Sequence, residues 1–410
     1  MNDVSTPIAP VPRISIQAFC EQTDTHHIMS AAQADRRMSK CHMKIHMGGA
    51  AAAVDAYRDA PTPNLIVIES SGEKSVLIEQ LEELSNLCDS GTKVIVIGRV
   101  NDILLYRELI ARGISEYIVH PFNSASFVRS VSELYAAPGS RLVGRVIAVT
   151  GSKGGVGAST VAHNLAWTMA RTLDQPTVIV DMDLPFGTAG LDFNQDPPQG
   201  IADAIFANDR LDANYVERLM SRCSDKLSIM AAPATLDRQY DLGEDAFEQV
   251  IDLLRGTAPF IVLDVPHGWS GWKRRTLVSA DDVLLVAGPD LASLRNAKNI
   301  FDALKPARAN DSRPKILMNG VGMLKRPEIS VSDFARAIEV ELTGIIPHDT
   351  KLFGTAANNG QMIGEIDQSS KIAESFVDLV RSMTGRSEVR RAKKNMFTPL
   401  MAKLGRKSAS

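Results

Sequence analysis

The sequence predicts an α/β protein with two doubly wound domains, each built on a parallel sheet that is covered by helices on both faces. Short β-branched apolar runs alternate along the chain with segments of helical spacing, and parallel neighbours need such crossover segments. The 410 residues exceed one ordinary domain of roughly 150 residues. The Pro/Gly/Ser break AAPGSR at 136–141 separates the two series of strands.

These observations divide the chain into a disordered N-terminus (1–12), a first domain (13–136), a linker (137–144), a second domain (145–385) and a basic tail (386–410). In the first domain, strands are expected at 13–19, 43–47, 64–70, 92–98 and 116–122. In the second domain, they are expected at 144–150, 176–183, 226–233, 260–266, 282–289, 314–321 and 342–349.

The composition is typical of a soluble globular protein, with 44% hydrophobic and 23% charged residues. The formal net charge of −3 gives no global basis for binding nucleic acid. The four cysteines lack paired spacing, which favours reduced thiols. The sequence shows no export signal and no apolar run of about 18 residues. We therefore expect a cytoplasmic protein.

The first domain contains the runs NLIVIES, TKVIVIG and GISEYIVHPF, which resemble the receiver domain of two-component response regulators. That family phosphorylates a strand-end aspartate, ends the next strand with a hydroxyl residue and places a lysine before the last proline. Here Glu69 or Ser70, Gly98 and His120 occupy these neighbourhoods. Glutamate is one methylene longer, and histidine is mostly neutral at pH 7. The resemblance implies a protein-binding pseudo-receiver without phosphotransfer; an unrelated flavodoxin-like docking domain stays open.

The second domain opens with a strand that leads into GSKGGVGAST at 151–160 and then into a long helix. Its glycines let backbone N–H groups converge on phosphate oxygens at a helix N-terminus. A hydroxyl at Ser159 stands where Mg²⁺ is bound, but Ala158 replaces the usual lysine. A purely structural turn is the alternative. The expected nucleotide-binding residues of the loop are Lys153, Gly154, Gly155, Val156, Gly157, Ala158, Ser159 and Thr160.

The lysine ahead of the glycines, Lys153, is typical of the deviant Walker motif, and here the chain resembles the ParA/MinD family of ATPases. In that family this lysine reaches across an ATP-bound dimer to the partner's phosphates. The resemblance implies a homodimer on nucleotide binding and a catalytic role for Lys153, which we expect to have no partner in the monomer. The missing lysine at Ala158 removes a charge-assisted contact of roughly 1.5–3 kcal/mol. Weak or absent ATP hydrolysis follows.

Three aspartates end strands in VIVDMDLPFG and FIVLDVPHG. Two of them are two residues apart, so both project to the same side of an extended chain. The resemblance places Asp181 with Ser159 in the magnesium shell, Asp183 near the attacking water, and Asp264 on a magnesium-bound water. A role as a cap or turn residue is the alternative for any single aspartate.

Nearer the C-terminus, ILMNGV resembles the family segment whose asparagine contacts adenine, which implies that role for Asn319. The segment IIPHDTKLFGTAANNGQMIGEID resembles the one that closes the base pocket, with Pro347 and Asp349 as contacts. We expect Trp269 and Trp272 to be packing or interface anchors.

The alanine in the loop, the receiver-like domain, LDVPHGW and PDLASLRNAKN together resemble the CpaE/TadZ branch, the localisation ATPases of Flp/Tad-type pilus assembly. This resemblance implies a polar spatial organiser that binds pilus assembly or secretion proteins through its first domain. The alternative is a fully active MinD/ParA-like ATPase in cell division or DNA positioning.

The tail from 386 to 407 carries eight basic residues and one acidic residue. Leu400, Met401 and Leu404 would share one face of a helix that starts near Pro399. A basic amphipathic helix is typical of contact with a membrane surface, here the inner membrane. A solvated disordered tail and a nucleic-acid arm are the alternatives, although no specific nucleic acid is expected.

Overall fold

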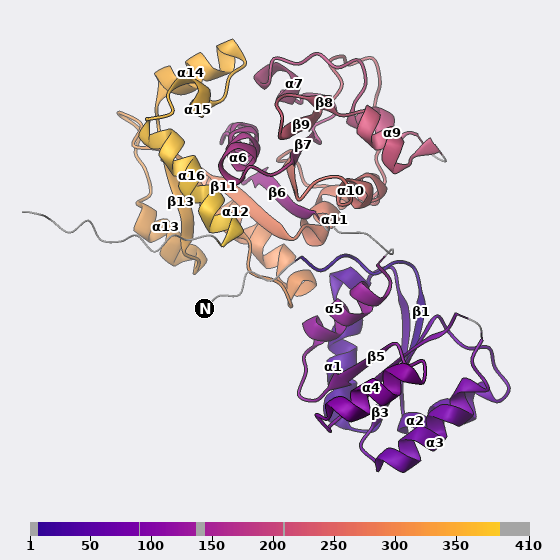
Figure 1. The fold of residues 1–410 in the computed structure, drawn as a ribbon. Helices are drawn as coiled ribbons and strands as arrows, with labels where there is room; N and C mark the ends of the chain where they lie inside the picture. The colour runs from indigo at the N-terminus through magenta and orange to yellow at the C-terminus, as the bar shows by residue number, and fades with distance from the viewer. Residues whose placement is uncertain (1–6, 90, 137–143, 208–209, 386–410) are drawn as a thin grey trace, which may run out of the picture.

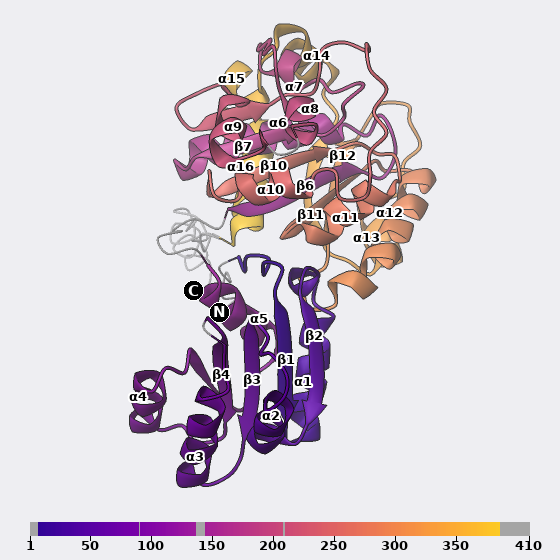
Figure 2. The same cartoon turned by 90° about the vertical axis from the view of Figure 1, so that its right-hand side faces the viewer.

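The computed structural model describes residues 7–89, 91–136, 144–207 and 210–385 and confirms the two α/β units (Figure 1). The N-terminal unit and the C-terminal unit each contain one sheet, and Figure 2 shows them one above the other. The expected linker, apart from its last residue, and the expected basic tail lie outside the described residues.

The N-terminal unit has a five-stranded sheet in the order β2-β1-β3-β4-β5, with every pair parallel. Its strands are β1 (Ser15–Cys20), β2 (His42–Met47), β3 (Leu65–Ser70), β4 (Lys93–Gly98) and β5 (Glu116–Val119). Its helices are α1 (Thr23–Gln33), the 3₁₀ helix η1 (Arg36–Met38), α2 (Gly49–Tyr57), α3 (Lys74–Ser85), α4 (Ile103–Ala111) and α5 (Ser124–Leu134).

Both faces of this sheet are covered, because successive residues of a strand point to opposite sides. Val67 of β3 packs in the cluster with α1 and α5, whereas Ile66 and Ile68 pack in the cluster with α2, α3 and α4. Two residues of the N-terminus that the sequence predicts to be disordered pack against this unit. Val11 is buried and its N–H donates to the Arg37 carbonyl, and Ile8 packs beside the same core.

The C-terminal unit has an eight-stranded sheet in the order β13-β12-β11-β6-β10-β7-β9-β8, parallel except for β8 against β9. Its strands are β6 (Arg145–Gly151), β7 (Thr177–Asp181), β8 (Ser221–Arg222), β9 (Leu227–Met230), β10 (Phe260–Val265), β11 (Asp282–Ala287), β12 (Lys315–Val321) and β13 (Leu342–Pro347). The seven expected strands are present, and the short β8 was not predicted.

The helices of this unit are α6 (Ala158–Leu173), α7 (Ala189–Asp192), α8 (Ile201–Ile205), α9 (Ala213–Arg218), α10 (Glu248–Leu254), α11 (Gly271–Ser279), α12 (Leu291–Leu304), η3 (Pro306–Arg308), α13 (Val331–Ile338), α14 (Thr350–Asn359), α15 (Ile363–Ile366) and α16 (Lys371–Thr384). Val146 and Ala148 of β6 pack with α10 to α13, and Ile147 and Val149 pack with α6 and α16. β6 is thus buried on both faces, which places the loop that follows it at the centre of the sheet edge. None of the described helices is long and apolar enough to cross a bilayer.

A buried ionic network joins the two units. Arg36 and Arg37 of η1 both pair with Asp311, Arg36 through Nε at 2.6 Å from Oδ2. Arg36 also lies 3.3 Å from Asp281 and donates to the Ser279 carbonyl. Both arginine side chains are 6% exposed, so these charges are held away from water and depend on one another.

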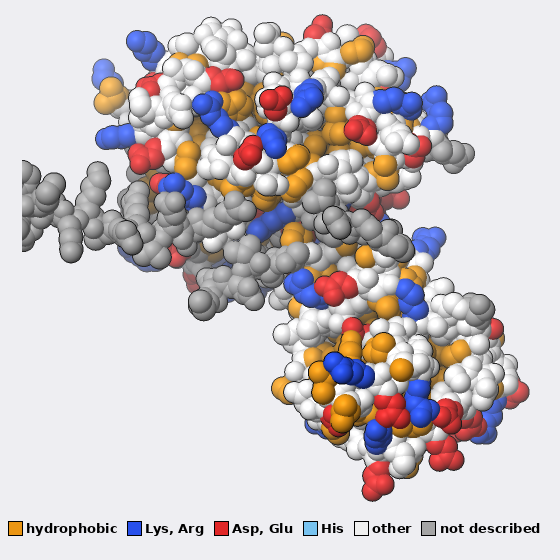
Figure 3. All heavy atoms as spheres, in the orientation of Figure 1, with side chains coloured by type: hydrophobic (Ala, Val, Ile, Leu, Met, Phe, Trp, Pro, Cys, Tyr) orange, Lys and Arg blue, Asp and Glu red, His pale blue; other side chains and the backbone are white. Residues whose placement is uncertain are grey.

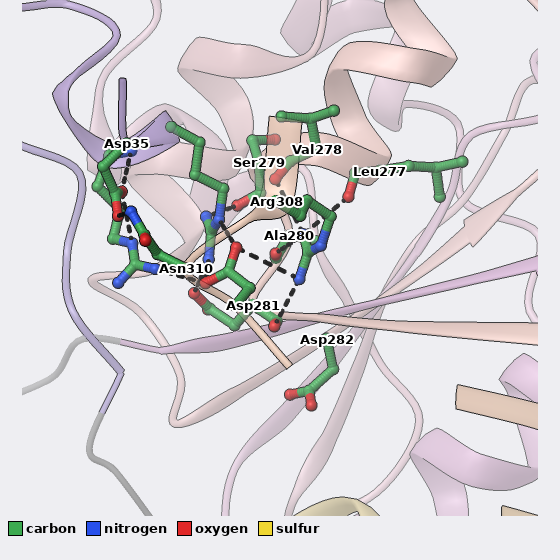
Figure 4. A network of polar contacts seen from close by, with 12 residues as sticks. Asp35, Leu277, Val278, Ser279, Ala280, Asp281, Asp282, Arg308 and Asn310 are labelled. Carbon is green, nitrogen blue, oxygen red and sulfur yellow. Dashed lines mark hydrogen bonds and ion pairs between the residues drawn. The ribbon is translucent and has the colours of Figure 1, made fainter. Parts of the chain in front are cut away.

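The network continues into the C-terminal unit, where it reaches the end of α11 (Figure 4). Arg308 Nη1 donates to the carbonyls of Leu277, Val278 and Ala280 at 2.9, 2.9 and 2.6 Å. The carboxyl end of α11 is therefore fixed from two sides, by Arg308 of its own unit and by Arg36 of the other.

Candidate functional site

A cavity of about 660 Å³ lies at the carboxyl ends of β6, β11, β12 and β13, the edge where ligands bind in open parallel sheets. The loop after β6 forms one wall, and the segments that follow β12 and β13 form the other. Of the residues expected from the sequence, it is lined by Lys153, Gly154, Gly155, Val156, Gly157, Thr160, Asn319, Pro347 and Asp349. Ala158 and Ser159 form the first turn of α6 and do not line it.

The loop needs glycine at specific positions. Gly155 and Gly157 have φ of +76° and +80°, a region that L side chains rarely adopt. A Cβ on Gly157 would lie 2.6 Å from Asn319 Nδ2. That amide donates to the Val156 carbonyl at 2.8 Å, whereas its Oδ1 is buried without a hydrogen-bond partner. Asn319 thus supports the loop and keeps one acceptor available.

Lys153 has a partner in its own chain, contrary to the expectation from the sequence. Its Nζ lies 2.8 Å from Asp290 Oδ2, and Arg326 lies 3.0 Å from the same oxygen. Asp290 also caps α12 by accepting from the Ser293 N–H at 2.9 Å. Burial raises the pKa of Asp290, but the hydrogen bonds and the charge of Lys153 outweigh it, so the pKa lies below its usual range. Asp290 is the residue that precedes α12, three residues after β11 ends at Ala287.

Asp181 and Asp264 lie opposite each other on neighbouring strands, β7 and β10. Asp181 is fully buried and accepts from the N–H groups of Asp183 and Ala189 at 3.1 and 3.0 Å. Burial, and then the charge of Asp264, raise the pKa of Asp181. Neither carboxylate lines the cavity.

Asp183 lies beyond the end of β7, so the extended geometry expected for Asp181 and Asp183 does not reach Asp183. β7 ends at Asp181, and the chain turns there because the Asp183 N–H donates to the Asp181 carboxylate. Asp183 lines a separate cavity of about 570 Å³, which also includes Trp272. Burial raises the pKa of Asp183, and the charge of Asp264 adds to this effect. Together they outweigh the hydrogen bond from the Phe186 N–H, which lowers the pKa.

His163 of α6 belongs to the same buried group, and the sequence did not predict it. Its Nδ1 lies 2.7 Å from Asp192 Oδ2 and its Nε2 lies 3.3 Å from Asp264 Oδ2. Burial alone would lower the pKa of His163, but contacts with Asp192 and Asp264 outweigh it and raise the pKa to about 10. A histidine inside an otherwise apolar helix face was the available indication.

Lys273 of α11 is a second buried group that the sequence did not predict. Its side chain is fully buried, and its Nζ donates to Thr150 Oγ1 at 2.8 Å and to the Pro266 carbonyl at 2.6 Å. Burial lowers the pKa of Lys273 to about 7. Lys273 thereby joins β6, just before the glycine loop, to the turn that follows β10.

Replacing Lys273 with methionine is expected to change how stability depends on pH. The folded pKa of about 7 lies below the unfolded value of about 10.4, so the unfolded state binds more protons between these values. Wild-type stability therefore gains a contribution as pH rises through this window. The free energy of unfolding of Lys273→Met minus that of wild type should fall by a few kcal/mol, at about 1.36 kcal/mol per pKa unit, from pH 7 to pH 10. Urea unfolding of both proteins at several pH values measures it, and a constant difference would contradict it.

In the N-terminal unit, the residues at the receiver-like positions are held by contacts that leave little room for phosphotransfer. Glu69 is 2% exposed, accepts from the backbone N–H groups of Glu21 and Gln22 at 2.7 and 2.9 Å, and accepts from Thr25 Oγ1 at 2.7 Å. A permanent cation is present nearby, because Arg99 lies 3.8 Å from Glu69. The glutamate therefore acts as a fixed structural acceptor.

Gly98 is required by Tyr117. A Cβ at Gly98 would lie 2.2 Å from Tyr117 Oη, and that hydroxyl donates to the Val100 carbonyl at 2.9 Å. The tyrosine ring therefore occupies the space that a hydroxyl residue at the end of β4 would need.

The two tryptophans of the C-terminal unit differ in their surroundings. Trp272 packs on Phe247 at 4.8 Å between ring centroids, whereas Trp269 is 52% exposed.

Comparison with known proteins agrees with this geometry. A family model described as an AAA domain matches residues 144–317. The septum site-determining protein MinD of Synechocystis sp. is 27% identical over 251 residues, 59% of this chain and 90% of that relative. The solved pilus assembly protein CpaE from Caulobacter crescentus is 44% identical and covers 32% of this chain and 100% of that chain, with a TM-score of 0.31. A solved ParA family ATPase from Chlorobium tepidum is 24% identical and covers 58% of this chain and 98% of that chain, with a TM-score of 0.53.

A parallel sheet whose central strand leads through a glycine loop into a buried helix defines the C-terminal unit as a P-loop NTPase fold, which the Chlorobium tepidum structure shares. In sequence, the C-terminal unit is similar to MinD proteins, and part of the chain is similar to the pilus assembly protein CpaE.

Proposed function

We propose that this protein is a nucleotide-dependent spatial organiser of Flp/Tad-type pilus assembly, which binds Mg-ATP in a dimer and hydrolyses it slowly or not at all. The observation that carries the proposal is the cavity that the glycine loop lines together with Asn319, whose buried Oδ1 has no hydrogen-bond partner. The similarity to CpaE, a pilus assembly protein, supports the cellular context.

The residues around the cavity fit ATP. An adenine amino group can donate to the buried Asn319 Oδ1, whose unmet hydrogen bond costs free energy until a donor arrives. Gly155 has open space where a Cβ would be, so phosphate oxygens can approach the backbone N–H groups closely. Lys153 and Arg326 supply positive charge at the same cavity. Pro347 and Asp349, which line the opposite wall, would close the base pocket.

Ser159, Asp181 and Asp264 would hold Mg²⁺, since hydroxyl and carboxylate oxygens are the ligands this ion takes. Once bound, the ion would neutralise phosphate charge. Asp181 and Asp264 are neighbours in the β7–β10 register. Asp183 would orient a water from its turn, and Lys153 would reach a partner's phosphates after release from Asp290.

Slow turnover follows from Ala158 at the first position of α6. The family's usual lysine there would place a positive charge on the phosphates, and this chain provides none from that position. The charge has to come from Lys153 of a second copy, which makes dimerisation a condition for turnover.

The N-terminal unit would bind pilus assembly or secretion proteins. Apolar side chains gather on its surface over α4 (Figure 3). Ile103 and Leu104 are 65% and 68% exposed, and Val100 and Ile110 lie beside them on the same segment. Clustered apolar exposure of this kind marks interaction surfaces. The basic tail, outside the described residues, would provide contact with the inner-membrane surface or the cell pole.

Isothermal titration calorimetry tests the proposal directly. Mg-ATP should bind to the wild-type protein, with turnover below about 1 s⁻¹, the lower end of ordinary enzyme rates. Ala158→Lys should bind Mg-ATP at least about tenfold more tightly, because it restores a charge-assisted contact.

Gly157→Ala is the matched loss-of-binding control, since its Cβ would collide with Asn319. Absence of Mg-ATP binding at millimolar concentration would refute the proposal. Turnover above about 1 s⁻¹ would favour the alternative, a fully active ATPase in division or DNA positioning, which the MinD relatives support and Ala158 opposes.

A further inference from the structure

Three buried side chains converge behind the cavity. His163, Asp181 and Asp264 each offer one ligand atom, and these atoms lie within 4.8 Å of one another. They come from α6, β7 and β10, which the central sheet holds together. Their relative exposures are 0, 0 and 3%, so the sheet and helix fix their positions. Two atoms that each lie about 2.1 Å from one ion are at most about 4.2 Å apart, so a metal ion would draw the three ligands slightly closer together.

The orientation of His163 points independently to a ligand. Its Nδ1 lies 2.7 Å from Asp192 Oδ2, which assigns the ring proton to Nδ1. Its Nε2 is fully buried and has no aligned hydrogen bond, although Asp264 Oδ2 is 3.3 Å away. Metal-bound histidines usually donate the other ring N–H to a carboxylate in this way. Nε2 thus lies toward the carboxylate of Asp264, and a metal ion bound there would displace the proton on Nε2.

The donor set selects among metals. Mg²⁺ prefers oxygen ligands in octahedral geometry and retains waters, whereas first-row transition metals accept imidazole together with carboxylate. His163 lies on α6, three residues after Thr160. Its imidazole is therefore an unusual neighbour for two carboxylates that would bind only Mg²⁺. Asp192 also lines the cavity, so the group lies one side chain away from the nucleotide pocket.

We propose that His163, Asp181 and Asp264 form a buried centre for a divalent transition-metal ion such as Co²⁺, Mn²⁺ or Zn²⁺, with Asp192 as the positioning residue of the histidine. The centre rests on the proposed function in one respect, since it shares Asp181 and Asp264 with the expected Mg²⁺ shell. It differs from that shell in its histidine ligand and in forming without nucleotide.

Titration of the metal-free, nucleotide-free full chain with Co²⁺ tests the centre by the visible absorption bands of bound Co²⁺ and by calorimetry. One Co²⁺ per chain should bind, and a large excess of Mg²⁺ should not displace it. His163→Gln should weaken Co²⁺ binding by at least tenfold, and Asp192→Asn by about 10- to 100-fold. His267→Ala, which removes an exposed imidazole near the same loop, should leave the affinity unchanged.

Absence of Co²⁺ binding to the wild-type protein would overturn the centre, as would equal binding by wild type and both variants. Asp192→Asn keeps the test valid if His163→Gln does not fold, because it leaves the buried cluster in place. Mg-ATP binding on the same samples separates the two proposals. Co²⁺ binding without ATP binding refutes the proposed function and supports the centre, and ATP binding with Mg²⁺ but no Co²⁺ binding does the reverse.

Discussion

Replacing Asp311 with alanine is expected to lower the free energy of unfolding by about 3–5 kcal/mol, since it leaves buried charges without their partner. Asp311 is 10% exposed and pairs with Arg36, Arg37 and Arg308. Without Asp311, three neighbouring guanidinium groups would share less negative charge. Differential scanning calorimetry should show a lower midpoint, and the two units should unfold in separate transitions.

Asp225→Ala is the control, because Asp225 forms an exposed pair with Arg222 at 3.5 Å and its side chain is 97% exposed. Such surface pairs contribute about 0–1 kcal/mol. An Asp311→Ala midpoint equal to that of Asp225→Ala would show that the buried network does not stabilise the joined units.

The network also predicts loss of stability in acid. Burial would raise the pKa of Asp311, but the charges of Arg36 and Arg37 outweigh it and hold the pKa below its usual range. A carboxylate with a depressed folded pKa stabilises the fold above the unfolded value of about 3.9, and this contribution is lost as pH falls through the folded value. The difference between wild type and Asp311→Ala should therefore shrink below about pH 4.

Lys153→Ala is expected to abolish ATP-dependent dimerisation and to change the stability of the monomer only slightly. In the dimer, the lysine would meet phosphates in a desolvated seam, where charge-assisted contacts are strong. In the monomer, the Lys153 side chain that pairs with Asp290 is 36% exposed. Exposed pairs of this kind contribute about 0.2–1 kcal/mol to the free energy of unfolding. Analytical ultracentrifugation with and without ATP measures the first effect, and thermal unfolding of the apo protein measures the second.

Lys351→Ala serves as the matched control, since it removes an exposed lysine from α14 outside the loop. That variant should dimerise with ATP as the wild type does. Equal dimerisation with and without ATP, in both wild type and Lys153→Ala, would show that nucleotide is not the switch.

The fold was predictable because the central strands are apolar runs bounded by turn residues, whereas the edge strand β2 alternates polar and apolar residues. β6, for example, is buried on both faces and therefore contains no alternating polar residues that would obscure it. The two-residue β8 offers no such run. The packing of Val11 depends on a contact with η1, which is remote in sequence, and local composition does not report such contacts.

The site was predictable where one motif carried it and not where several elements meet. The glycine loop follows β6 and Asn319 lies in β12, and the structure brings them to one cavity. His163 and Lys273 matter through partners about a hundred residues away, Asp264 and Thr150. β7 ends at Asp181, where the Asp183 N–H donates to the Asp181 carboxylate, and strand periodicity cannot indicate where a strand ends.

Helix α11 gives the molecule a mechanical link. Near its first turn, Lys273 is anchored to Thr150, directly ahead of the glycine loop, and at its last turn Ser279 is held by Arg36 of the other unit. Nine residues of helix form a stiff rod of about 13 Å, at 1.5 Å per residue. A shift of the loop that moves this rod has to act on the interface between the units. By thermodynamic reciprocity, a partner that moves the rod from the N-terminal unit changes nucleotide affinity by the same factor that nucleotide changes the partner's affinity.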